Sequence, residues 1–298
     1  MNTSAQNIRN PIVTEKSLED FFEIMERRPD VVPEHKYDSL NTLWNACDRA
    51  EQQNLIKHLI FEFFVLDSSK QLEACRRIAK FVKEQQFKNS ETLIIGVAND
   101  KEIDGSTAAL QILKNKFHDA ETWHSRFYPS IPAGVAEIKN GNNIILFDDF
   151  IGSGNKILRK KKWVISILKK HYKDIDVETL KFHVMSFAGM FSGLEKIDND
   201  IDIKHTFSSF ILTRGISDMP GLEQDAIDEN VRVMQELEEK LGRNYINKKI
   251  SDYSLGYDRS ETLYCAINDN CPNNVFPIFW WPKLANGEQY ETLFHRVG

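Results

Sequence analysis

Apolar residues recur at helical spacing through the first ninety residues of the chain. Ser17-Leu-Glu-Asp20 predicts a helix start, because a Ser cap is followed by an acidic residue three positions later. A long helical stretch is expected over 39–63, and after a polar break at 67–69 another helix is expected over 72–85. No strand is predicted here, so residues 1–90 are expected to form a helical N-terminal region.

After residue 90 the pattern changes to short apolar runs that alternate with amphipathic segments. Strands are predicted over 92–98, 134–139, 143–147, 180–187, 207–213, 263–267 and 275–279. Helices are predicted over 106–116, 153–172 and 220–241. Asn140-Gly141 is a tight-turn signal, which would allow the strands on either side of it to pair antiparallel. The alternation predicts an α/β fold over 91–298, with a largely parallel sheet and helices on both faces.

The composition is that of a soluble globular protein, with 41% hydrophobic and 28% charged residues. No apolar run reaches the roughly 20 residues of a membrane span, and the polar start of the chain lacks the order of a signal peptide. A cytoplasmic protein without a membrane partner is therefore expected. The formal net charge of -6 argues against bulk affinity for nucleic acid. The cysteines form no C-x-x-C pair, so neither structural zinc nor a disulfide framework is expected.

One segment, 144–156, joins an apolar strand to two acidic residues, a turn of small residues and a helix start. Asp148 and Asp149 are predicted at the carboxyl end of that strand, where open α/β sheets bind ligands. The small residues let the backbone approach an anion, and the helix start offers N–H groups and a positive dipole end. The phosphate-binding residues expected from this pattern are Gly152, Ser153, Gly154, Asn155 and Lys156. With two carboxylates beside it to accept hydrogen bonds from a diol, the segment predicts a ribose 5-phosphate site.

Successive side chains of a strand point to opposite faces, so Asp148 and Asp149 can face one ligand only if the chain turns at this point. The small residues just beyond favour such a turn. Other phosphate motifs fit less well, because Asn155 precedes Lys156 where the P-loop needs Gly, and Ile157 stands where G-x-G-x-x-G needs its last glycine. The competing interpretation is an ordinary strand–turn–helix connection. The order of apolar strand, acid pair and turn favours the ligand site over it.

Residues 144–156 resemble the phosphoribosyl pyrophosphate signature of type I phosphoribosyltransferases. The residues that match this signature are Asp148, Asp149, Ser153 and Gly154. Lys156 departs from it, because the family usually has Thr at this place to bind the 5-phosphate. The resemblance implies that both acids are catalytic residues that hold the ribose diol. It also implies Mg²⁺ as cofactor, bound mainly through substrate phosphates and without dedicated protein ligands.

The resemblance extends more weakly to two other segments. The strand over 92–98 lies where the family has the strand before its pyrophosphate loop. The candidate residues of that loop are Asn99, Asp100, Gly105 and Ser106; the alternative is an ordinary polar loop with a Ser cap. The run 268–280 resembles the ending of a divergent branch found in bacterial conflict systems, including retron anti-phage operons. Its base-binding candidates are Asn270, Asn273, Asn274 and Trp280; the alternative is a turn of Asn and Pro with a Trp pair that seals the core.

Basic residues at 159–162 and 169–170 give one predicted helix a basic face. A solvated helix face is the simpler interpretation. A contact with a nucleic acid, such as the DNA–RNA hybrid of a retron, is the alternative.

The predicted function is that of a phosphoribosyltransferase-like enzyme that acts on phosphoribosyl pyrophosphate or a nucleotide with Mg²⁺. The resemblance implies a toxic effector of an anti-phage defence system such as a retron. Its partners would then be a reverse transcriptase with its DNA–RNA hybrid, or an ATPase, and association into a homo-oligomer stays open. The alternative is a catalytically inactive module of the same fold that senses a nucleotide or binds a partner.

Overall fold

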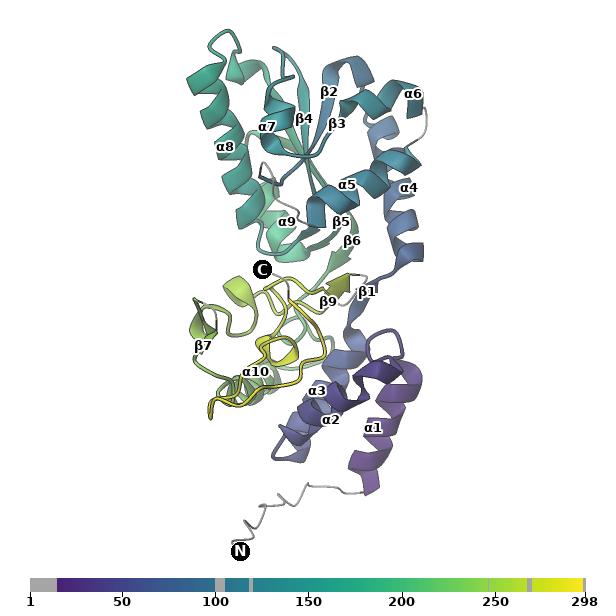
Figure 1. The fold of residues 1–298 in the computed structure, drawn as a ribbon, viewed down its shortest axis with the longest axis vertical. Coiled ribbons are helices and arrows are strands. Elements are labelled where there is room, and N and C mark those ends of the chain that lie inside the picture. Colours follow the sequence, from purple (N-terminus) through teal and green to yellow (C-terminus); the bar gives the residue numbers. More distant parts are fainter. Residues whose placement is uncertain (1–14, 100–104, 118–119, 246, 267–269, 297–298) are drawn as a thin grey trace, which may run out of the picture. The chain divides into compact units, whose positions relative to one another are not determined.

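A computed structural model describes residues 15–99, 105–117, 120–245, 247–266 and 270–296 (Figure 1). The chain divides into two compact units. Leu66–Thr213 forms one of them, and Met1–Val65 together with Arg214–Gly298 forms the other. The first unit is thus inserted into the sequence of the second, and the division differs from the boundary predicted at residue 90.

The unit of residues 66–213 contains a five-stranded sheet in which neighbouring strands run parallel. Its strands are β2 (Thr92–Gly96), β3 (Phe127–Tyr128), β4 (Asn143–Ile151), β5 (Lys181–Met190) and β6 (Ile203–Leu212). Their spatial order is β3-β2-β4-β5-β6. The chain therefore runs from β2 outward to β3 and then returns to the other side of β2. The order of strands reverses between β2 and β4, and the predicted largely parallel sheet is confirmed.

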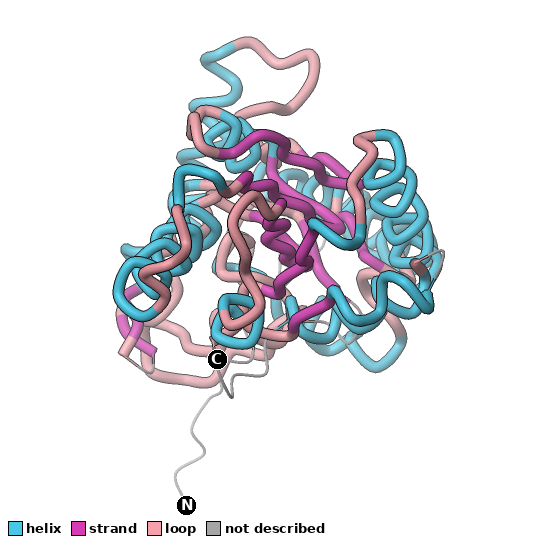
Figure 2. The backbone as a smooth tube through the Cα atoms, turned by 90° about the horizontal axis from the view of Figure 1, so that it is seen from above, coloured by secondary structure: helices cyan, strands magenta, loops and turns pink. Residues whose placement is uncertain are grey.

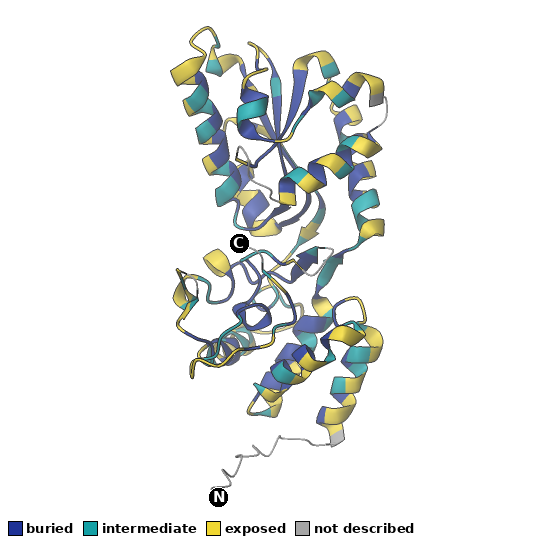
Figure 3. Cartoon of the chain, in the orientation of Figure 1, coloured by how far each residue is buried: buried dark blue, intermediate teal, exposed yellow. Residues whose placement is uncertain are grey.

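Helices cover both faces of this sheet, and its central strands β2, β4 and β5 are mostly buried (Figures 2 and 3). On one face lie α4 (Ser68–Glu84) and α5 (Gly105–Lys116), and on the other α7 (Ile131–Val135), α8 (Asn155–His171) and α9 (Phe191–Asp198). The short helix α6 (Ala120–Trp123) precedes β3. Ile144 and Leu146 of β4 share the core of α7, α8 and α9, so Ile145 and Phe147 point to the α5 side. Strands buried on both faces explain the continuous apolar runs of the sequence.

The other unit packs its helices around a separate apolar core. These helices are α1 (Glu15–Arg27), α2 (Tyr37–Asn45), α3 (Ala50–Glu62) and α10 (Gln224–Glu238). Phe63 joins the two ends of the chain in this core, because its ring lies 5.2 Å from that of Phe279 and 4.7 Å from that of Phe294. Short strands complete the unit: β1 (Phe64–Leu66) pairs with β9 (Tyr264–Ala266), and β7 (Asn244–Tyr245) pairs with β8 (Lys248–Lys249).

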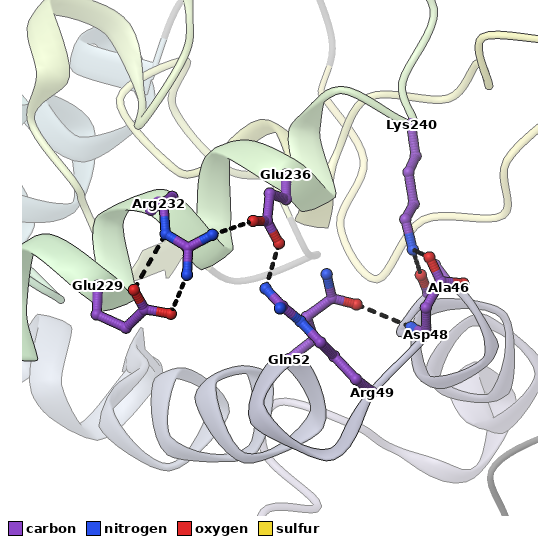
Figure 4. A network of polar contacts seen from close by, with 8 residues as sticks. All are labelled: Ala46, Asp48, Arg49, Gln52, Glu229, Arg232, Glu236 and Lys240. Carbon is purple, nitrogen blue, oxygen red and sulfur yellow. Dashed lines mark hydrogen bonds and ion pairs between the residues drawn. The ribbon is translucent and has the colours of Figure 1, made fainter.

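A polar network ties α10 to the residues between α2 and α3 (Figure 4). Arg232 of α10 bonds Glu236 one turn later at 2.8 Å, and Glu236 also accepts a hydrogen bond from Arg49. Lys240, just after α10, pairs with Asp48 at 2.6 Å. Segments from the two ends of the sequence are thus joined by charge as well as by apolar packing.

Several predicted elements are wrong. Residues 134–139 do not form a strand, because Ser130 caps the short helix α7, which begins at Ile131 and has Pro132 in its first turn. Asn140-Gly141 makes a turn, with φ of 79° at Gly141, but the turn leads into β4 rather than closing a hairpin. Pro277 likewise begins a 3₁₀ helix where a strand was expected over 275–279. The helical stretch over 39–63 is divided into α2 and α3, and β1 lies where no strand was predicted.

The predicted boundary at residue 90 placed α4 with the N-terminal helices. In the structure α4 packs on β5 and β6, where Arg77 donates to the carbonyl of Ser209 at 2.7 Å and the Ser209 hydroxyl donates to the Ala74 carbonyl at 3.1 Å. Residues 214–298, by contrast, share a core with α1, α2 and α3. Helical periodicity shows which face of a helix is buried, but not which core buries it.

Candidate active site

β2 and β4 separate at the point where the order of strands reverses. Gly96, the last residue of β2, is the register partner of Phe147, and the N–H of Val97 donates to the Phe147 carbonyl at 3.1 Å. Beyond Phe147, β4 continues in pairing with β5 as far as Ile151. Doubly wound sheets bind ligands outside the carboxyl ends of the strands at such a reversal. Asp148 and Asp149, the next two residues of β4, therefore lie where a ligand is expected.

Asp148 and Asp149 point to opposite faces of the sheet, because β4 stays extended until Ile151. The turn that would bring both to one side does not occur at this point. Asp148 faces α8, whereas the carboxylate of Asp149 lies against the start of α5. A Cβ atom added to Gly105 would lie only 2.4 Å from Asp149 Oδ2. The two carboxylates thus flank the end of β4 instead of standing side by side.

The carboxylate of Asp148 is buried and forms an ion pair with Lys156. Asp148 is 1% exposed, and Lys156 Nζ lies 3.1 Å from Oδ2 and 3.2 Å from Oδ1. The N–H of Asp149 also donates to Asp148 Oδ1 at 3.1 Å. A buried carboxylate needs such partners to keep its charge. The side chain of Lys156 is itself 40% exposed, so it lies at the surface of the unit, beside the start of α8.

The turn between β4 and α8 packs closely on α9. Gly154 has a φ of 76°, in the left-handed region, and caps α8 without a side-chain hydrogen bond. A Cβ atom on Gly193, in the first turn of α9, would lie 1.9 Å from the carbonyl oxygen of Gly152. Only glycine fits at 193 without moving the backbone. This contact holds the turn at the N-terminus of α8, whose positive end suits an anion.

The second candidate loop begins at Asn99, directly after the apolar residues that follow β2. Lys160 of α8 donates from Nζ to Asn99 Oδ1 at 2.6 Å. Gly105 and Ser106 open α5, and Ser106 is fully buried. Asp100, the fourth predicted residue of this loop, lies outside the described residues. Asn99, at the start of this loop, is therefore hydrogen-bonded to α8, and Gly105, at the start of α5, lies against Asp149.

The run of basic residues at 159–162 does not form one solvated face, because consecutive helix residues point in different directions. Arg159 and Lys162 are exposed, but Lys160 and Lys161 are buried. The ammonium group of Lys161 pairs with Asp200 and with Asp202, the latter at 2.9 Å. Two of the four basic side chains, those of Lys160 and Lys161, thus bind partners within the same unit.

The base-binding candidates belong to the other compact unit and make contacts within it. Trp280 is 3% exposed, and its Nε1 donates to a backbone carbonyl at 2.8 Å. Asn274 is buried and donates to the Ser260 hydroxyl at 3.0 Å. The backbone carbonyl of Asn270 accepts a hydrogen bond from the N–H of Ala266, and that of Asn273 accepts one from the N–H of Tyr257. Trp280 is thus part of the apolar core of its unit, and base binding by these four residues stays a prediction.

The sequence did not point to two residues of the site. Lys160 was seen only as part of a basic run, although its spacing of four from Lys156 puts both lysines on one helix face. Gly193 gave no signal, because its contact is with a turn distant in sequence. In the described part of the chain, no three His, Cys, Asp or Glu side chains gather to hold a metal ion. Within those same residues, no helix has the length and apolar character to cross a bilayer.

Comparison with known proteins gives one family match. The model of the PRTase-CE family matches residues 34–296, which is most of the chain. A search of curated proteins found no match. Among solved structures, "Structure of AQ2163 protein from Aquifex aeolicus" matches with 10% sequence identity and a TM-score of 0.30. That match covers 67% of this chain and 88% of the other, and its TM-score is too low to support an argument.

Proposed function

The chain belongs to the PRTase-CE family of phosphoribosyltransferase-like proteins, and from this premise we propose that the end of β4 binds a ribose 5-phosphate compound such as phosphoribosyl pyrophosphate. One observation carries the proposal: two helix N-termini lie on opposite faces of the sheet, beside one pair of carboxylates. The start of α8 follows Asp148 on one face, and the start of α5 lies against Asp149 on the other. Helix N-termini favour phosphate groups.

A ribose with phosphate groups at both ends fits this arrangement. Its hydroxyls lie between the 5-phosphate, which would bind at α8 with Lys156, and the anomeric pyrophosphate, which would bind at α5. No hydrogen bond from a described residue reaches the half-buried carboxylate of Asp149, so this group can accept one from a ribose hydroxyl. Asp148, which Lys156 already engages, is proposed to hold that lysine beside the 5-phosphate.

The proposed reaction exchanges pyrophosphate and a nitrogenous base at the anomeric carbon. Displacement there develops positive charge on the ribose, and the carboxylate of Asp149 would stabilise that charge. Asp149 also offers the hard oxygen donor that Mg²⁺ prefers, whereas Asp148 is occupied by Lys156. Mg²⁺, bound mainly through the phosphates of the substrate, would neutralise the leaving pyrophosphate. The remaining task of the chain is to hold the two ends of the ligand in place.

The test combines binding and turnover. Calorimetry with phosphoribosyl pyrophosphate and with ribose 5-phosphate measures binding, and pyrophosphate release in the presence of Mg²⁺ and mixed bases measures turnover. Asp149→Asn keeps the size of the side chain and is expected to lower turnover by roughly 10²–10³ without changing the melting temperature. If neither ligand binds to the unsubstituted protein, the proposed function is wrong.

The ion pair of Lys156 with Asp148 favours a second candidate function. In that pair a lysine occupies one of the two carboxylates that would otherwise hold the ribose diol. The same fold would then sense a nucleotide, or bind a partner, without turning the ligand over. Tight binding with no pyrophosphate release, and no difference in release between the parent and Asp149→Asn, would support this second function.

We further propose that the protein is an effector of a bacterial defence system such as a retron, on the resemblance of the run 268–280 alone. Its partners would be a reverse transcriptase with its DNA–RNA hybrid, or an ATPase. Expression without partner genes should then arrest growth and deplete ribose phosphates or nucleotides in a metabolite profile. Normal growth with unchanged nucleotide pools would contradict the effector role.

A further inference from the structure

We propose that Lys160 is a positioning and specificity residue, which makes the site prefer a ribose carrying pyrophosphate at its anomeric carbon over ribose 5-phosphate. This inference rests on the proposed function, because it assigns a role within the same site. Lys160 lies in the second turn of α8, one turn after Lys156. The two lysines serve different ends of the ligand.

The ammonium group of Lys160 is held inside the unit instead of extending into solvent. The residue is 8% exposed, its Nζ donates to Asn99 Oδ1 at 2.6 Å, and it lies 5.1 Å from the centre of the Trp163 ring. A lysine on a helix can usually carry its charge to water along its flexible stem. Burial of the charge costs free energy, which an apolar residue at this position would avoid. The ammonium group is therefore held at a fixed position, which its hydrogen bond to Asn99 defines.

The two lysines reach two different strands of the site. Residues four apart share a helix face, so Lys156 and Lys160 start from the same side of α8. Lys156 extends to Asp148 on β4, whereas Lys160 extends to Asn99, the residue with which the connection from β2 toward α5 begins. Lys156 thus lies with the 5-phosphate at the start of α8. Lys160 lies at Asn99, from which the chain leads to α5, the helix that would receive the pyrophosphate.

Two effects of Lys160 would act on the pyrophosphate alone. Its charge is shielded from water, so its attraction for a phosphate group is screened less than that of an exposed lysine. Its hydrogen bond also fixes Asn99 before the ligand arrives, which removes part of the cost of ordering the site. Ribose 5-phosphate lacks the pyrophosphate and gains from neither effect.

Lys161 provides a matched control in the same helix. It is 3% exposed and pairs with Asp200 and Asp202, which lie between α9 and β6. Lys161→Met therefore removes a buried lysine of α8 without touching Asp148 or Asn99. It is expected to lower the melting temperature and to leave the preference between the two ligands unchanged.

The experiment measures both ligands by calorimetry on the full chain, with Lys160→Met, Lys160→Arg and Lys156→Met. Lys160→Met keeps an apolar side chain over Trp163, and should weaken binding of phosphoribosyl pyrophosphate roughly 10- to 100-fold while changing ribose 5-phosphate less than about 2-fold. Lys160→Arg keeps the charge and should recover most of the loss. Lys156→Met should weaken both ligands.

Equal weakening of both ligands by Lys160→Met, or no weakening of either, would overturn the inference and leave the proposed function intact. Failure of the unsubstituted protein to bind either ligand would instead overturn the proposed function, and this inference with it. If Lys160→Met does not fold, Lys160→Gln decides the question, because it removes the charge and keeps a polar hydrogen-bond donor, on a shorter side chain, near Asn99. Unchanged preference in Lys160→Gln would refute the role of the charge.

Discussion

Gly105 and Asp149 occupy adjoining space at the start of α5, and one added methyl group tests whether this contact places the carboxylate. A Cβ atom on Gly105 would lie 2.4 Å from Asp149 Oδ2, 2.7 Å from Cγ and 2.8 Å from Oδ1. Carbon atoms in good contact are about 3.5–4.0 Å apart, so the carboxylate would have to move by about 1 Å. The backbone of Gly105 is not in the left-handed region, so alanine fits it without strain.

Gly105→Ala should therefore separate function from stability. Alanine is a better helix former than glycine by up to about 1 kcal/mol, so the melting temperature should stay the same or rise. A displacement of about 1 Å at a positioning group can lower the rate by about 100-fold. The assays are thermal melting, calorimetry with phosphoribosyl pyrophosphate, and pyrophosphate release. Full affinity and full activity in a well-folded Gly105→Ala protein would refute the assigned role of Asp149.

A double-mutant cycle supplies the control for this prediction. Asp149→Ala removes the carboxylate that the new methyl group would displace, so Gly105→Ala should cost nothing further in that background. The effects of the two substitutions should thus be strongly non-additive. If they simply add, the alanine acts by some route other than the contact with Asp149, and the argument from the contact fails.

Three further predictions concern packing, pH and charge. The methyl group of Gly193→Ala would press on the Gly152 carbonyl and should lower the free energy of unfolding by about 1–3 kcal/mol. Gly141 has nothing within 4 Å of an added Cβ atom, so Gly141→Ala should cost only the roughly 1–2 kcal/mol of its left-handed φ. Thermal melts compare the two variants. Burial raises the pKa of Glu238 from 4.5 to about 7, although Ser254 and the Leu255 N–H bond its carboxylate. The folded pKa is the higher one, so the contribution of Glu238 to stability should be fully present below pH 4.5 and be lost as pH rises through about 7, and Glu238→Gln should remove this part of the pH dependence in urea unfolding. Lys156→Ala should weaken ribose 5-phosphate binding by about 1.5–3 kcal/mol in calorimetry, and unchanged affinity would mean that Lys156 does not touch the ligand.

The sequence predicted the sheet because its central strands are buried on both faces and appear as unbroken apolar runs. The apolar run of β4 extends further along the chain than the strand predicted over 143–147. Phe150 and Ile151 continue the apolar run of β4 past the acid pair, and both are buried. They show that the strand does not turn at Asp148 and Asp149. The Gly-Ser-Gly turn begins directly after Ile151, so it marks the end of the strand beyond both acidic residues.

The sequence pointed to those residues of the candidate site that are neighbours in sequence, and not to contacts between distant residues. The acid pair and the start of α8 lie within one short segment, so their pattern is visible in a single window. Lys160 and Asn99 are distant in sequence, and nothing in the types of these two residues predicts that they meet. Gly105 of α5 and Asp149 of β4 are likewise distant in sequence, and their residue types do not predict that they meet. Only the register of the sheet, with β2 beside β4, brings such pairs together.

The division of the chain offers a last prediction, on how much of it is needed to build the site. The boundary expected at residue 90 would cut α4 away from β6, where the Phe81 ring stacks on Phe207 at 4.4 Å. It would also remove Phe63 from the core that holds Phe279. A fragment of residues 66–213 keeps α4, the whole described sheet and both lysines of α8, so it should fold cooperatively and bind phosphoribosyl pyrophosphate.

The fragment of residues 91–298 contains more of the chain and should nevertheless fold less well, because it leaves two cores incomplete. Loss of one large core side chain such as Phe typically costs about 3–5 kcal/mol, and this fragment lacks Phe63 and the whole of α4. Such a loss is comparable with the entire stability of many domains. Circular dichroism melts and hydrogen exchange of the two fragments provide the comparison. A cooperative melt of 91–298 at the temperature of the full chain, with 66–213 unfolded, would show that residue 90 is the true boundary and that α4 contributes little to the sheet.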